Sequence, residues 1–187
     1  SVTLPEIENS VARATAWTAA TQIGVTLSNL VESDVRIPRV QGFYTGVQVT
    51  GVGAGTVFCN ISLGYLYNNK RNLRLVNGAG WANSNNFFGG QLSFDSGIGT
   101  QVSGTRHLHL DDEAPSTYGI PNANTFIGTG VEGNVVEYEL ECLGGRNQFI
   151  NVRWESAAPR ARFSGAEAVY NFIIGGFYAD ELLVVSQ

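Results

Sequence analysis

The residues best suited to chemistry concentrate in one short stretch, RHLHLDDE, which spans residues 106–113. It contains both histidines of the chain, His107 and His109, and ends in three consecutive carboxylates. Two side chains two positions apart lie on the same side of a regular β-strand. Two histidines and one carboxylate are also a known ligand set for a catalytic metal ion. The stretch therefore raises the hypothesis of a metal enzyme, against the alternative of a strand whose polar side faces water or another subunit.

The spacing His-x-His-x-x-x-Glu resembles the first metal-binding motif of the cupins, which are small jelly rolls. The resemblance implies that His107, His109 and Glu113 are metal ligands. This sequence departs from the cupin pattern in two ways. Gln101 stands where a glycine is expected, and no histidine follows His109. A cupin-like metal enzyme is therefore kept as an alternative. The main prediction is a protein that is not an enzyme, with no catalytic residue, metal or other cofactor.

On the main prediction, RHLHLDDE is the end of a strand that runs into an acidic loop. Its leucines face the core, and its histidines and acids face water or a subunit. Protonation of His107 and His109 near pH 6 would then alter a subunit contact, since histidine is the side chain that titrates in this range.

Three glutamates in NVVEYELECL show the sharpest alternation in the chain, which predicts a half-buried strand. Carboxylates along one strand face are too far apart to enclose Ca²⁺ unaided, so a solvated or inter-subunit face is expected. The two predicted sides are Glu137, Glu139 and Glu141 on one, and Val136, Tyr138, Leu140 and Cys142 on the other.

The two cysteines, Cys59 and Cys142, each lie in a strand-like run. They are interpreted as two buried free thiols, although they could instead face one another across a sheet. No nucleophile–base series can be assembled, because both histidines belong to one strand and no G-x-S-x-G motif occurs.

Composition narrows the class of protein. Of 187 residues, 43% are hydrophobic and only 14% are charged, with a formal net charge of −5. The charged fraction is well below the usual value of about 25%. No cluster of Lys and Arg is present, which argues against direct nucleic-acid binding through phosphates.

No apolar run approaches the roughly 20 residues of a membrane span, and no signal peptide is recognisable. Synthesis in a host cytoplasm is therefore expected.

The elements that must position these residues are predicted to be strands. Runs of β-favouring residues alternate with turns rich in Gly and Asn, which gives about eight strands. The segment GVGAGT, residues 51–56, is interpreted as a hairpin turn between two of them. No repeat of fixed period is visible, which argues against β-solenoids. The prediction is a single all-β domain, residues 1–187, with residues 1–35 as a possible N-terminal arm. Its fold is predicted to be a single jelly roll, a two-sheet antiparallel β-sandwich, with an immunoglobulin-like sandwich as the runner-up.

Low charge and many aromatic residues favour a protein that packs against copies of itself, because charged residues are depleted in the buried centre of interfaces. In these features the chain resembles the single-jelly-roll capsid proteins of tailless icosahedral viruses. Its preference for Arg over Lys and its acidity are similar to the small capsid protein of the sphaerolipovirus-like group, whose shell lies over an internal membrane. The resemblance implies a capsid subunit of a virion whose partners are copies of itself and other capsid proteins.

The third hypothesis is a carbohydrate-binding β-sandwich. Trp81, Tyr118 or Tyr67 would then supply the aromatic surface on which a sugar ring stacks.

Overall fold

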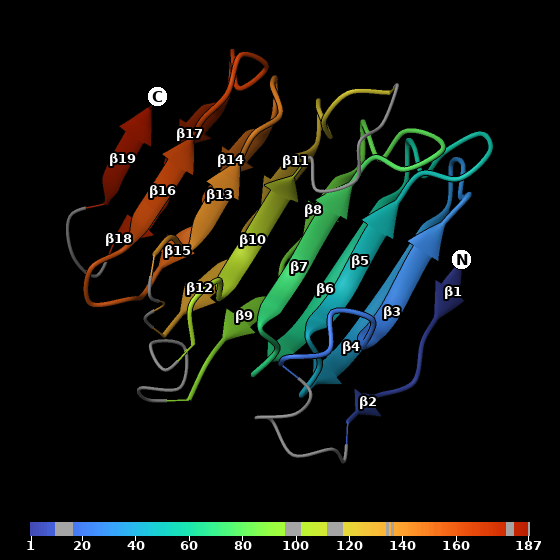
Figure 1. The fold of residues 1–187 in the computed structure, drawn as a ribbon, viewed down its shortest axis with the longest axis horizontal. Helices are drawn as coiled ribbons and strands as arrows, with labels where there is room; N and C mark the ends of the chain where they lie inside the picture. The colour runs from blue at the N-terminus through green and yellow to red at the C-terminus, as the bar shows by residue number, and fades with distance from the viewer. Residues whose placement is uncertain are drawn as a thin grey trace.

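The protein folds into two parallel β-sheets that face each other across a common core (Figure 1). The computed structural model describes residues 1–9, 17–95, 102–111, 118–133, 135, 137–178 and 182–186. The seven-stranded sheet, in spatial order, contains β3 (Ile23–Ser28), β5 (Thr45–Thr50), β7 (Arg71–Val76), β10 (Arg106–Asp111), β13 (Leu140–Cys142), β16 (Arg160–Phe163) and β19 (Leu183–Ser186).

The twelve-stranded sheet is built from two short strands that precede β3 and from the segments that connect successive strands of the seven-stranded sheet. Its first strands are β1 (Val2–Thr3), β2 (Ile7–Glu8), β4 (Asp34–Gln41) and β6 (Asn60–Tyr67). Each later turn of the chain contributes two short strands: β8 (Asn86–Phe88) and β9 (Gln91–Ser93), β11 (Thr125–Ile127) and β12 (Gly130–Glu132), β14 (Gln148–Ile150) and β15 (Arg153–Trp154), β17 (Phe172–Ile174) and β18 (Phe177–Tyr178).

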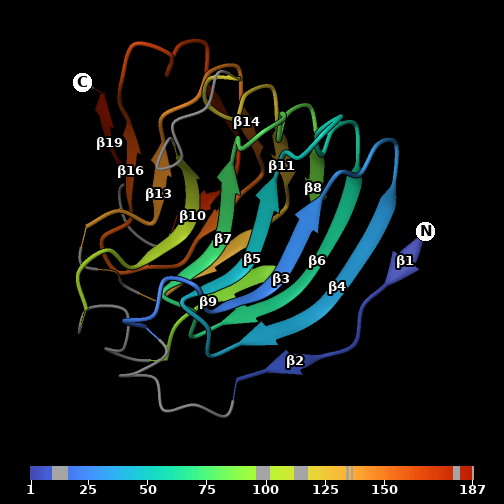
Figure 2. The same cartoon turned by 45° about the vertical axis from the view of Figure 1, so that its right-hand side comes forward.

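Successive turns of the chain stack as the coils of a β-solenoid. Each strand pairs in parallel with the strand one coil away, as β5 does with β7 and β7 with β10. The colour gradient runs steadily along the stack, and the two termini lie at opposite ends of it (Figures 1 and 2). Within the twelve-stranded sheet, β6 pairs with both β8 and β9. Two glycines, Gly89 and Gly90, separate β8 from β9, and both have a positive φ that favours glycine.

The prediction of an all-β chain is confirmed, but the jelly roll is wrong. A jelly roll is antiparallel, whereas every pairing between the described strands is parallel. The segment 51–56 is not a hairpin turn, because it carries the chain from β5 in one sheet to β6 in the other. The argument against a solenoid failed because the coils differ in length. Strands of the seven-stranded sheet begin at residues 23, 45, 71, 106, 140, 160 and 183.

The predicted N-terminal arm, residues 1–35, contributes strands to both sheets of its own chain. Strands β1 and β2 pair in parallel with β4, and β3 pairs with β5. Residues 10–16, which follow β2 within this segment, lie outside the described part of the chain.

One corner of the solenoid is held by a ladder of four asparagines, of which the first three are fully buried and the last is partly buried. Each ladder residue immediately precedes the first strand of its coil in the twelve-stranded sheet. In Asn124, Asn147 and Asn171, the Oδ1 atom accepts a hydrogen bond from the backbone N–H of the preceding ladder residue, with N···O distances of 2.9–3.0 Å. The amides therefore satisfy backbone groups that this buried corner would otherwise leave unpaired. The ladder consists of Asn85, Asn124, Asn147 and Asn171.

Beside the ladder, three phenylalanines stack through the core. The ring centroids of Phe87 and Phe126 are 4.7 Å apart, and those of Phe126 and Phe149 are 5.1 Å apart, with nearly parallel planes. All three side chains are fully buried. The stack follows from the parallel register, which places identical positions of successive coils next to each other.

Candidate functional site: a charged row on the seven-stranded sheet

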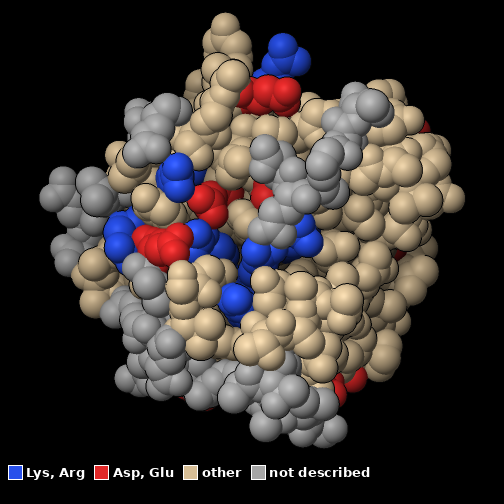
Figure 3. All heavy atoms as spheres, in the orientation of Figure 1, with Lys and Arg blue, Asp and Glu red and all other residues tan. Residues whose placement is uncertain are grey.

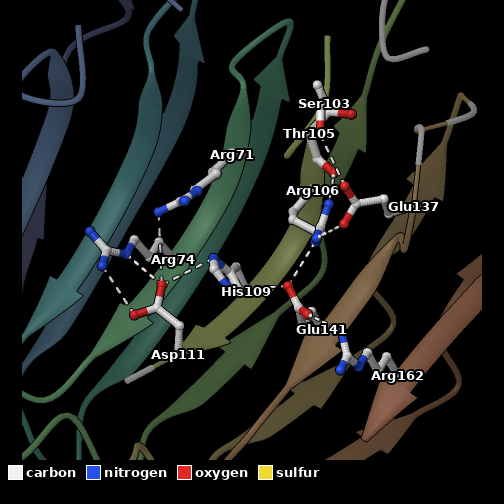
Figure 4. Close-up of polar contacts among 10 residues, drawn as sticks. All are labelled: Arg71, Arg74, Ser103, Thr105, Arg106, His109, Asp111, Glu137, Glu141 and Arg162. Atoms are coloured by element: carbon white, nitrogen blue, oxygen red, sulfur yellow. Dashed lines mark hydrogen bonds and ion pairs between the residues drawn. The ribbon is translucent and has the colours of Figure 1, made fainter. Parts of the chain in front are cut away.

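Charged side chains gather on the outer face of the seven-stranded sheet. Figure 3 shows this face, with Arg, Asp and Glu clustered over its middle and left parts and few charges on the right. The parallel register aligns Arg74 on β7, His109 on β10, Glu141 on β13 and Arg162 on β16 in one row. Asp111 lies beside this row (Figure 4). Residues far apart in sequence thus meet because they occupy matching positions in successive coils.

The two histidines do not share a face of β10. The backbone N–H groups of His107 and Leu108 both donate to the carbonyl oxygen of Glu139, at 3.1 and 2.9 Å. This is the hydrogen-bond pattern of a β-bulge, in which two successive residues oppose one residue of the neighbouring strand. His107 consequently enters the interior together with Leu108, and alternation resumes at His109. The prediction that both imidazoles point the same way is wrong for this reason.

His107 is a fully buried, neutral histidine. Its Nε2 lies 2.8 Å from the carbonyl oxygen of Gly133, so Nε2–H donates there. Its Nδ1 lies 3.1 Å from Nδ2 of Asn72 and accepts from that amide. The ring also packs against Phe94, with centroids 4.7 Å apart. Burial lowers the pKa of His107 to about 4, despite the hydrogen bond to Gly133, so this residue holds no charge at neutral pH.

His109 lies between two carboxylates. Its Nδ1 is 3.0 Å from Oδ2 of Asp111, without the alignment of a linear hydrogen bond, and its Nε2 is 3.3 Å from Oε2 of Glu141. Burial lowers the pKa of His109, but the contacts with Asp111 and Glu141 outweigh burial, and the net shift is upward.

Both carboxylates are held ionised by this environment. Asp111 accepts two hydrogen bonds from Arg74, at 2.6 and 3.0 Å. Burial raises the pKa of Asp111, but the contacts with His109 and Arg74 lower it by more than burial raises it, so the net shift is strongly downward. The contact with His109, together with Arg106, lowers the pKa of Glu141 to about 2. Neither acid retains a proton at neutral pH, so neither can serve as a general acid in this arrangement.

The rest of the charged face is cross-linked in the same way. Arg106 contacts both Glu137 and Glu141 through its guanidinium group. The guanidinium groups of Arg106 and Arg162 also lie over the ring of Tyr138, 5.7 and 5.4 Å from its centroid. Tyr138 was predicted on the apolar side of its strand but lies among these cations.

The predicted glutamate ladder is divided between the two faces. Glu137 and Glu141 belong to the charged face, but Glu139 is buried at 1% exposure. Oε2 of Glu139 accepts from the backbone N–H of Arg160, at 2.6 Å, and burial raises the pKa of this carboxyl. The β-bulge at His107 explains this division. The backbone carbonyl of Glu139 accepts hydrogen bonds from both His107 and Leu108, the two consecutive residues of β10 that point inward. Leu140 and Cys142 are buried as predicted, and Val136 lies outside the described residues.

The proposed metal ligands are not assembled by the described residues. His107 and His109 lie on opposite faces of β10, and Glu113 falls outside the described part of the chain. Across the described ranges, no cluster of three or more His, Cys, Asp or Glu side chains could hold a metal ion. Cys59 and Cys142 are both buried free thiols, the interpretation that the sequence favoured.

Two of the three predicted sugar-stacking residues come together at a corner of the solenoid. The rings of Trp81 and Tyr118 form an edge-to-face pair with centroids 5.2 Å apart, and Trp81 is 48% exposed. Tyr67 lies elsewhere, stacked on Tyr65 at 4.9 Å.

The sequence missed the cationic half of the charged row. Arg74 and Arg162 are separated from His109 by whole coils, so no local spacing pattern connects them.

The chain matches no protein-family model, and no curated protein or solved structure is significantly similar to it. In the described parts of the chain, no helix has the length and apolar character needed to cross a membrane.

Proposed function

We propose that this chain is a structural subunit whose solenoid packs side by side with copies of itself in a larger particle, such as a spike or fibre of a virion. The observation that carries the proposal is an apolar row on the outer face of the twelve-stranded sheet. The row consists of Phe88, Ile127, Ile150 and Ile174, which the parallel register places next to one another.

The row faces outward because its neighbours in sequence face inward. Phe87, Phe126 and Phe149 form the buried stack, so the residue after each points away from the core. Phe88 is 39% exposed and Ile174 is 49% exposed, while the two isoleucines between them are half-buried. Four apolar side chains at matching positions of four adjacent strands form a contiguous row, which is unusual for a fully solvent-exposed surface.

An assembly interface accounts for this row better than a substrate site does. The row itself carries no titratable side chain that could act on a ligand. Burial of apolar surface stabilises association by roughly 25 cal/mol per Å². The low charge of the chain further reduces the cost of removing water from its surface. The icosahedral shell of the capsid prediction depended on the jelly roll, so the proposal keeps the structural role and the self-association without that shell.

The test is the oligomeric state of an Ile127→Asp/Ile150→Asp variant, measured by sedimentation velocity and light scattering over a range of concentrations. We expect the unsubstituted protein to associate, and the double variant to remain monomeric at concentrations at least tenfold higher. The two carboxylates would have to be buried unpaired in the interface, which is strongly unfavourable.

The matched control is Thr125→Asp/Gln148→Asp, which places two carboxylates on the same strands in the adjacent outward row. It should associate like the unsubstituted protein if the apolar row is the contact. A monomeric unsubstituted protein at the highest concentration, or a double isoleucine variant that associates normally, would contradict the proposal.

A second candidate function, glycan binding, is supported by the exposed pair of Trp81 and Tyr118. Aromatic faces of this kind can stack on a sugar ring. The other two tryptophans, Trp17 and Trp154, are 1% and 0% exposed, so ligand-induced changes in fluorescence quenching by acrylamide would report on Trp81. Binding on a glycan array that is lost in Trp81→Ala, together with protection of the fluorescence from acrylamide, would establish this function. Silence in both assays would exclude it.

A further inference from the structure

The outer face of the seven-stranded sheet contains a line of contacts that crosses four strands. It runs from Arg74 on β7 to Asp111 and His109 on β10, then to Glu141 on β13 and Arg162 on β16 (Figure 4). The distances along it are 2.6, 3.0, 3.3 and 3.3 Å. If His109 is a cation, the charges along the line alternate without interruption.

The chemistry of the imidazole ring decides its state at this position. A neutral imidazole carries one N–H, and its other nitrogen presents a lone pair. In this site both nitrogens lie against carboxylate oxygens, at 3.0 and 3.3 Å. Either neutral tautomer would therefore leave one nitrogen with a lone pair beside a carboxylate oxygen, whereas in the imidazolium both nitrogens carry an N–H and the ring carries a positive charge between the two carboxylates.

His109 is surrounded by charged side chains from its own strand and from the neighbouring strands of the sheet. The carboxylates of Asp111 and Glu141 are 2% and 12% exposed, so little water is present to relieve a repulsive contact. Cations also lie nearby and oppose the positive charge of the ring, but each is paired with a carboxylate. The charged groups on this face are Arg71 and Arg74 from β7, Arg106 and Asp111 from β10, Glu137 and Glu141 from the β13 segment, and Arg162 from β16.

We infer that His109 is an imidazolium clamp that joins the coil of β10 to the coil of β13, and that loss of its proton loosens the solenoid at this point. His107, two residues earlier, has the opposite environment and takes no part. The clamp gives the protein a device that is closed at neutral and mildly acidic pH and opens on the alkaline side.

The sign of the pH dependence follows from the net upward shift in the pKa of His109. A group whose pKa is higher in the folded than in the unfolded protein stabilises the fold fully below its unfolded pKa, about 6.5 for histidine. This contribution is lost as the pH rises through the higher folded value. Asp111 and Glu141 stay ionised throughout that range, because both of their pKa values are lowered.

The protonation state can be read directly from the unsubstituted protein by ¹H–¹⁵N correlation spectroscopy of its imidazole nitrogens. The chain has only two histidines, so two sets of ring signals are expected. At pH 7 one set should be that of an imidazolium and the other that of a neutral Nε2–H ring, which is His107. The His109→Gln variant should remove the imidazolium set alone. Two neutral rings at pH 7, or titration of His109 below pH 6.5, would overturn the inference.

The clamp itself is tested by urea unfolding between pH 6 and pH 9. The urea midpoint of the unsubstituted protein should fall as the His109 signals titrate, and this fall should be absent in His109→Gln. The control is Arg153→Gln, which removes an exposed ion pair with Glu155 on the other sheet and should keep the fall. An imidazolium whose titration leaves the urea midpoint unchanged would show that His109 is charged but clamps nothing, which also overturns the inference.

Discussion

The asparagine ladder offers the sharpest test of the fold, through the substitution Asn124→Ala. Oδ1 of Asn124 accepts the backbone N–H of Asn85 at 3.0 Å, and its Nδ2 donates to the carbonyl oxygen of Ala82 at 3.1 Å. Alanine would break both bonds and leave two buried backbone groups without these partners. Each such group costs about 1–3 kcal/mol, so we expect the free energy of unfolding to fall by about 2–6 kcal/mol.

The assay is equilibrium unfolding in urea, followed by circular dichroism, with amide hydrogen exchange of Asn85 as a local readout. The control is Asn86→Ala, which removes an exposed side-chain bond to Asn60 and should change stability by no more than about 0.5 kcal/mol. Equal effects of the two substitutions, with unchanged exchange at Asn85, would refute the claim that the ladder holds the coils together.

Three further predictions concern the core. Phe126→Ala removes the central ring of the phenylalanine stack and should lower the free energy of unfolding by about 3–5 kcal/mol in urea titrations, whereas Phe126→Leu should cost clearly less. Burial lowers the pKa of His107 to about 4, so its contribution is complete above pH 6.5 and is lost as the pH falls towards 4. This loss amounts to about 3 kcal/mol, and an acid limb identical in His107→Gln would contradict it. Cys59 and Cys142 should both resist a thiol reagent at pH 8 in the folded protein and both react in urea, because burial raises both thiol pKa values, that of Cys142 to about 12. A disulfide, or fast reaction in the native state, would disprove this.

The sequence did contain a signal of the solenoid, although not one of fixed period. An asparagine followed two residues later by phenylalanine recurs at the same corner of three coils. Its spacing is irregular because the intervening loops differ in length, so a search for a constant repeat misses it. The three copies are Asn85-Asn86-Phe87, Asn124-Thr125-Phe126 and Asn147-Gln148-Phe149.

Local pattern determined which residues prefer strands and which apolar side chains enter the core. Leu108 and Leu110 are buried as their alternation predicted, and so are Leu140 and Cys142. These preferences depend on side-chain shape and on burial of apolar surface, which are properties of each short segment.

Only the tertiary structure decided how the strands pair and which polar groups meet. Alternation looks the same in an antiparallel hairpin and in a solenoid coil, because it records that one face is buried and not which strand lies alongside. The partners of β10 are β7, one coil earlier, and β13, one coil later. The alignment of His109 with Arg74 and Glu141 therefore depends on the path of the chain around each corner. The bulge at His107 is likewise invisible in the sequence. It turned RHLHLDDE from one polar face with two histidines into a strand with one histidine in the core and one buried among charged groups on the outer face of the sheet. These different surroundings shift the two pKa values in opposite directions.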